Sequence, residues 1–128
     1  MAFKLTKNDV TTTPAAEYMP CSMGEYSPGD AIAFSEGKLA KASADTLPTY
    51  VCLEKGTKKE NETLCVYRIL PSMTFETVSS ENKTSFEIGE KYALNASADG
   101  ITSTKGSSFE VTSLTSKGAS TVIKGRFN

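Results

Sequence analysis

Few residues in this 128-residue chain have the chemistry that catalysis or metal binding requires. The chain has no histidine, which removes the commonest general base, the commonest metal ligand and every Ser-His or Cys-His nucleophile. The three cysteines, Cys21, Cys52 and Cys65, lack the paired spacing of a zinc site. The sequence therefore predicts no catalytic centre, no metal site and no cofactor.

The carboxylates, glycines and lysines do not change this expectation. Acidic residues such as Glu36, Glu54 and Glu87 lie in polar turns, where a solvated charge is the usual role. The glycines do not form the GxxxxGK[ST] motif of a phosphate-binding loop. Lys38 follows Gly37 at a tight turn, as the modified lysine of a lipoyl-like carrier domain would, but the acidic and hydrophobic neighbours of such a lysine are missing. We expect a protein that is not an enzyme.

Composition and charge exclude two further classes of partner. Fourteen basic and fifteen acidic residues give a net charge of -1 without a basic stripe, so no nucleic-acid partner is expected. No apolar stretch approaches the roughly 20 residues of a membrane span. The first ten residues also lack the apolar region of a secretory signal. We therefore expect a soluble protein without a membrane partner.

The cysteines indicate the compartment. Their number is odd, and Cys52 and Cys65 each lie inside an apolar run. This pattern favours small buried hydrophobic side chains over a disulfide, and with it assembly in a reducing cytoplasm.

Short strands and turns fill the chain from residue 28 onward. Asp99-Gly100 between two short apolar runs is typical of a hairpin turn, whereas the polar segment 55–62 predicts a solvated loop. No window fits the helical period. Apolar alternation predicts strands over residues 31–34, 38–42, 49–54, 63–70, 73–78, 91–94, 101–104, 108–114 and 121–127. The chain is therefore expected to be all-β, as a small sandwich or barrel.

Two segments repeat one pattern of turn, strand, turn and strand. They are SPGDAIAFSEGKLAKAS (27–43) and EIGEKYALNASADGITSTK (87–105), in which Gly29 corresponds to Gly89 and Ala33-Phe34 to Ala93-Leu94. This predicts two pseudo-repeated β units, about 28–70 and 86–127, packed into one domain over residues 28–128. Chance similarity between two hairpins is the alternative.

The first 27 residues have a different character. They contain a threonine run and two prolines, with no sustained period, and predict an extended N-terminal arm that is ordered against a neighbour or left as a floppy tail. The arm is more apolar than a solvated tail. We therefore expect contacts with a partner from five of its side chains: Phe3, Leu5, Tyr18, Met19 and Met23.

The order of these motifs resembles that of small head proteins of tailed bacteriophages, of the capsid-decoration or head-fibre-base type. The likeness covers most of the chain: the arm, the hairpin GDAIAFSEGKLAKAS, the strand PTYVCL, the hairpin IGEKYAL and the final VIKGRF. It implies a β-rich protein that binds the outside of an assembled capsid and reinforces it. The implied partner is the major capsid protein, with self-association as dimers or trimers on the lattice. The implied location is the surface of the virion head, after assembly in the host bacterial cytoplasm.

Three other classes of protein stay open at this point. The first is another virion component, such as a tail-tube, tail-terminator or connector protein. The second is a small adhesion or carbohydrate-binding β module, against which the absence of tryptophan argues mildly. The third is the lipoyl-like carrier domain.

Overall fold

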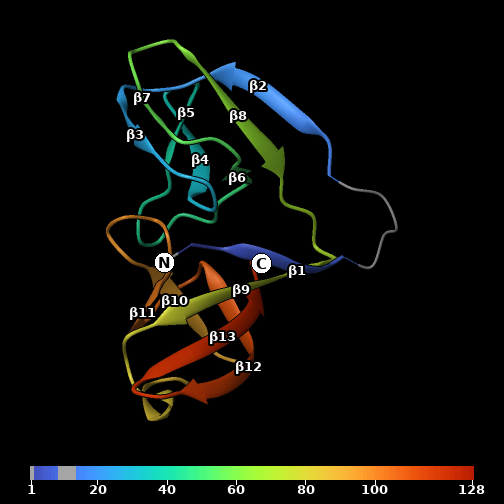
Figure 1. Ribbon diagram of the computed structural model, residues 1–128, viewed down its shortest axis with the longest axis vertical. Helices are drawn as coiled ribbons and strands as arrows, with labels where there is room; N and C mark the ends of the chain where they lie inside the picture. The colour runs from blue at the N-terminus through green and yellow to red at the C-terminus, as the bar shows by residue number, and fades with distance from the viewer. Residues whose placement is uncertain (1, 9–13) are drawn as a thin grey trace.

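The computed structural model describes residues 2–8 and 14–128, and it consists mainly of antiparallel strands (Figure 1). The predicted all-β class is confirmed. The described elements are β1 (Lys4–Asn8), β2 (Ala16–Pro20), β3 (Gly24–Tyr26), β4 (Ala31–Ser35), β5 (Lys38–Lys41), β6 (Tyr50–Cys52), β7 (Gly56–Lys58), β8 (Thr63–Arg68), β9 (Met73–Ser79), the 3-10 turn η1 (Lys83–Ser85), β10 (Lys91–Leu94), β11 (Ile101–Lys105), β12 (Phe109–Lys117) and β13 (Ser120–Arg126).

The strands form two main sheets and one ribbon. A five-stranded sheet has the order β2-β8-β6-β4-β5, a six-stranded sheet has the order β1-β9-β13-β12-β10-β11, and β3 pairs with β7. In Figure 1 the five-stranded sheet and the ribbon lie above the six-stranded sheet, and β1 runs between them.

Each sheet curls so that its last strand approaches a strand near its other end: β5 approaches β2, and β11 approaches β9, the second strand of the six-stranded sheet. Just after β2, the Ser22 N–H donates a 2.8 Å hydrogen bond to the carbonyl of Leu39 on β5. In the other sheet, the Ser103 hydroxyl of β11 lies 2.6 Å from a carboxylate oxygen of Glu81, just after β9. We call β2, β4, β5, β6 and β8 the first barrel, and β9 to β13 the second barrel.

The two barrels have the same strand order. The order is β2-β8-β6-β4-β5 in the first barrel and β9-β13-β12-β10-β11 in the second. When the five strands of each barrel are counted along the chain, both orders read first, fifth, fourth, second and third. Gly29 N–H donates to the Cys52 carbonyl at 2.9 Å, and Gly89 N–H donates to the Val111 carbonyl at 2.8 Å. The two barrels thus share a strand order and this hydrogen bond, while the pseudo-repeat in the sequence stays a prediction. The shared order also includes β2 and β9, which the predicted bounds of 28–70 and 86–127 leave out.

The central strands β4, β6 and β8 of the five-stranded sheet have consecutive buried residues, so they are buried on both faces, which accounts for their continuous apolar runs. Alternate residues such as Ile32, Leu64 and Val66 fill the interior of the first barrel. Their neighbours Val51 and Tyr67 face the other way and pack into a larger core that includes the second barrel.

The outer faces of the two barrels differ in polarity. Val51 pairs with Tyr67 in the first barrel, and both are buried against the second barrel. The corresponding pair in the second barrel is Glu110 and Arg126, and both side chains are partly exposed. Charged side chains resist desolvation, so this face does not offer the apolar contact that joins the two barrels.

The N-terminal 27 residues differ from the expectation of a separate arm. β1 pairs antiparallel with β9, and β2 pairs antiparallel with β8. The ring of Phe3 is buried, with its centroid 5.4 Å from that of Phe109 and 4.8 Å from that of Phe127. The described part of the segment is therefore tied to the chain's own sheets, because β1 and β2 pair with them and Phe3 and Leu5 pack into the chain's own core.

The polar segment 55–62 also differs from its prediction. It contains β7, which pairs with β3 in the register Gly24 with Lys58 and Tyr26 with Gly56. The pairing is possible because strand hydrogen bonds use the backbone, whatever the polarity of the side chains.

The three cysteines are free and buried, and for Cys52 and Cys65 this agrees with the apolar runs that surround them in the sequence. Cys52 lies inside the first barrel, where burial raises the pKa of its thiol to about 11 from an ordinary value of 9.0. Burial likewise raises the pKa values of Tyr26 and Tyr67 to about 12. The folded state therefore favours the neutral form of each of these groups.

We expect stability to fall as the pH rises from about 9 to 12. Below pH 9 the groups are neutral in both states, whereas above it the unfolded chain loses protons first. Cys52→Ser removes one titrating group and keeps a donor for the Glu54 carbonyl, to which the thiol lies at 3.1 Å. Urea unfolding measures the free energy of unfolding at pH 8 and at pH 11. Its decrease between the two pH values should be about 2 kcal/mol smaller in this variant than in the wild type. Equal decreases would contradict the assignment to Cys52.

Candidate interaction surface

The five side chains predicted to contact a partner do not form one surface. Phe3 is buried, and Leu5 is half-buried against the same core. Burial leaves Phe3 no surface to offer, so its predicted role as a partner contact is wrong for the folded chain. Met19 is also half-buried and packs against the interior of the first barrel.

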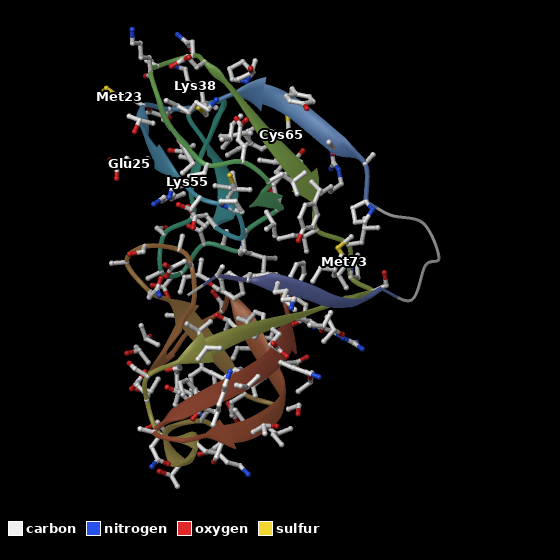
Figure 2. All side chains as sticks on the ribbon, viewed as in Figure 1. Met23, Glu25, Lys38, Lys55, Cys65 and Met73 are labelled. Atoms are coloured by element: carbon white, nitrogen blue, oxygen red, sulfur yellow. The ribbon has the colours of Figure 1, made fainter. Side chains whose placement is uncertain are left out.

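Tyr18 and Met23 are exposed, by 67% and 75%, but in different surroundings. Tyr18 lies on β2 opposite Cys65, which Figure 2 labels on β8. Met23 lies at the start of β3, toward the end of the molecule furthest from β12 and β13 in Figure 2. There it lines a shallow hollow of about 360 Å³ together with Tyr26 and Lys41.

The β2 strand is the last strand of its sheet, so among the residues that the structure describes no strand neighbours one side of its backbone in the sheet order. The side that faces β8 is identified by the hydrogen bonds of Cys21. Its N–H donates to the Glu62 carbonyl at 2.9 Å, and its carbonyl accepts from the Asn61 N–H at 2.9 Å. Backbone direction alternates along a strand, so Met19 and Glu17 also direct their backbone groups toward β8.

The other side of β2 carries the backbone groups of Ala16, Tyr18 and Pro20. Ser22 has the same orientation and donates to Leu39 of β5, so the C-terminal end of this side is covered. Pro20 has no N–H and therefore loses no hydrogen bond there. The N–H and carbonyl groups of Ala16 and Tyr18 form the open part of the strand, which we call the β2 edge.

Four side chains lie together at the end of the first barrel beside this edge, and we call them the barrel mouth. The Arg68 guanidinium stacks over the Tyr50 ring at 5.2 Å and donates to its hydroxyl at 3.0 Å. Arg68 Nε also lies 3.7 Å from a carboxylate oxygen of Glu17. Phe34 meets Tyr50 edge-on at 5.6 Å between centroids and is 51% exposed.

The hollow beside Met23 is a second concave feature, and two of its polar side chains are already engaged. The Tyr26 hydroxyl donates to the Ser22 carbonyl at 2.7 Å, and the Lys41 ammonium lies 3.6 Å from the Asp30 carboxylate. Glu60 and Lys38 lie outside the lining of the hollow. Glu60 accepts from the Met23 N–H at 2.9 Å and from the Lys38 ammonium at 3.1 Å. Because Lys38 is held in this ion pair, the structure gives no support to a freely projecting modified lysine.

The buried carboxylate of Asp30 has a structural use. It accepts from the Ser27 N–H at 2.9 Å and lies 3.6 Å from the Lys41 ammonium, which fixes the turn before β4. Burial raises the pKa of Asp30 above its ordinary value. In the part of the chain that the structure describes, no three His, Cys, Asp or Glu residues gather in a group able to hold a metal ion.

Sequence reasoning missed the barrel mouth. Arg68 shares a strand face with Leu64 and Val66, so a charged side chain ends a row of inward-facing apolar ones. Phe34 likewise follows Ile32 on one face of β4 yet stays exposed. In the sequence, Arg68 at the end of this apolar row was the feature that could have indicated the barrel mouth. Its contact with Glu17 and Tyr50, however, depends on pairing across three strands.

No family model, curated protein or solved structure matches the chain. The functional assignment therefore depends on the residues, their geometry and the order of the sequence motifs. Within residues 2–8 and 14–128, no helix is long and apolar enough to cross a membrane.

Proposed function

We propose that this chain is a structural protein of a tailed-phage virion, which binds the outer surface of the assembled head and reinforces it. The major capsid protein is the proposed partner, with self-association as dimers or trimers on the lattice. The chain would join the head in the bacterial cytoplasm and act without catalysis, cofactor or nucleic acid. The motif order of the sequence supports this class of protein.

The observation that carries the proposal is the β2 edge with its exposed aromatic neighbours. An open strand edge can add to another protein by backbone hydrogen bonds, and Tyr18 and Phe34 provide apolar area beside it. Tyrosine and arginine are also the residue types that contribute most to binding at protein interfaces. These features fit a protein that binds a large, regular partner.

The shared core supports a reinforcing role. Phe3 and Tyr67 belong to one buried cluster with residues of the second barrel, so the two barrels are joined by packing as well as by the chain. A body joined in this way transmits load between the subunits that it bridges. Many weak contacts on a lattice also reinforce one another, because each bound copy raises the effective concentration of the next contact.

Co-sedimentation with empty heads tests this function. Heads of the phage that encodes the chain, prepared without it, should bind the purified protein to a saturating ratio. Purified tails serve as the matched control. Protein that stays in the supernatant with heads contradicts the proposal, and binding to tails alone assigns the chain to the tail or connector class.

A further inference from the structure

The second barrel is flanked by an additional strand, β1, at the place where the first barrel has its open edge. β1 lies on the outer side of β9, with Lys4 opposite Glu76 and Leu5 opposite Phe75. Phe3 precedes this strand and lies against the end of the second barrel. The aromatic side chains there are Phe75, Phe109 and Phe127, with neighbouring centroids 5.0–5.1 Å apart.

The strand registers identify the same positions in the first barrel. Met19 pairs with Leu64 in the first barrel, and Thr77 pairs with Ile123 at the same place in the second barrel. Met19 therefore corresponds to Thr77. One and two residues earlier along the strands, Tyr18 corresponds to Glu76 and Glu17 corresponds to Phe75. By the same registers, Tyr50 corresponds to Phe109 and Arg68 to Phe127. The barrel mouth is therefore the counterpart of the aromatic cluster that Phe3 covers.

No described segment pairs with the outer side of residues 16–18. We propose that the β2 edge binds an extended segment of a partner protein by strand addition, antiparallel to β2. The segment would take the position that β1 takes on β9. One of its apolar or aromatic side chains would cover Phe34 and Tyr50, as Phe3 covers Phe109 and Phe127.

The charges at the mouth define the segment further. Glu17 and Arg68 lie 3.7 Å apart and offset each other, so the mouth carries no net charge to favour an acidic or a basic anchor. An aromatic anchor suits both the exposed Phe34 ring and the guanidinium, which stacks on aromatic faces. The expected segment therefore alternates apolar and polar residues, with an aromatic side chain at the mouth.

The segment comes from a different protein rather than from β1 of a second copy. Phe3 is 3% exposed in its own chain, so donating β1 would uncover the second barrel. That the donor is a capsid subunit rests on the function proposed above, whereas the strand site itself does not.

The site is tested with a synthetic peptide of residues 2–8, AFKLTKN, titrated at millimolar concentration into the isotope-labelled full chain. The tethered β1 keeps β9 occupied, because its effective concentration exceeds that of the free peptide. Saturable NMR shifts are expected at Ala16, Tyr18, Phe34 and Arg68. A peptide with alanine in place of its phenylalanine should bind at least about fivefold more weakly. Shifts only on β9, or no saturation, overturn the site.

Ala16→Pro removes a donor from the open side only, because the Ala16 N–H points away from β8. Pro20 already has the same orientation, so the fold is expected to persist. Ala16→Thr keeps the donor and is the matched control. The proline variant should bind the peptide at least about fivefold more weakly than the threonine variant. Equal affinities of two folded variants contradict strand addition.

The peptide and the heads separate the two proposals. If the peptide saturates the β2 edge but the protein does not bind heads, the strand-addition site stands and the proposed head function is rejected. If the protein binds heads but the peptide does not bind the β2 edge, the strand-addition site is rejected and the proposed head function stands.

Discussion

Gly125→Ala is expected to destabilise the second barrel strongly. A Cβ atom at this position would clash with the Glu110 carbonyl oxygen and lie 2.6 Å from a ring carbon of Phe109. Neither neighbour moves easily, because Glu110 belongs to the β12–β13 pairing and Phe109 is fully buried. Overpacking against backbone and a buried ring should cost about 3 kcal/mol or more. This is a large part of the 5–15 kcal/mol that stabilises an ordinary domain.

Gly56→Ala is the matched control, because a Cβ atom there meets no atom within 4 Å. Urea unfolding should place this variant within about 0.5 kcal/mol of the wild type. The close approach of the Glu110 carbonyl and the Phe109 ring explains why glycine is needed at position 125. In the first barrel the corresponding residue is Val66, which pairs with Cys52. If Gly125→Ala and Gly56→Ala unfold at the same urea concentration, the close contact with Phe109 is wrong.

Phe3→Ala is expected to destabilise the protein by about 3–5 kcal/mol, the range for removing a buried aromatic side chain. The reason is the loss of its ring contacts with Phe109 and Phe127, between the two barrels. The effect would be unusual for a residue so near the beginning of a chain, where ends are commonly loose. Chemical unfolding followed by near-UV circular dichroism measures it.

Tyr18→Ala is the control for this prediction, since the side chain is 67% exposed. Its effect on stability should stay within about 0.5 kcal/mol. A stable Phe3→Ala variant would restore the original expectation of a free arm. A destabilised one establishes that residue 3 belongs to the core and not to the partner surface.

The strands β4 to β6 and β8 to β13 were predictable because their signals are local. The alternation in residues 73–78 becomes β9, and the Asp99-Gly100 turn joins β10 to β11. Gly29 and Gly89, which mark the repeated pattern in the sequence, both have positive φ, at 88° and 92°. Turn chemistry and side-chain period determine such features within a few residues.

The remaining features depend on pairing between distant segments. Phe3 looks like an arm residue until β1 is placed on β9, about 70 residues later in the chain. The segment of β7 reads as a polar loop because its partner is backbone on β3. The barrel mouth needs Glu17, Tyr50 and Arg68 from three strands, and no local pattern brings them together.

The proposed role in the virion is tested most directly by electron cryo-microscopy of heads prepared with and without this chain. The difference map should show the two stacked barrels on the outside of the capsid shell, repeated over the lattice, with the β2 edge facing a capsid subunit. Density for the chain at the tail or connector, or no difference on the outer surface, would contradict the proposal.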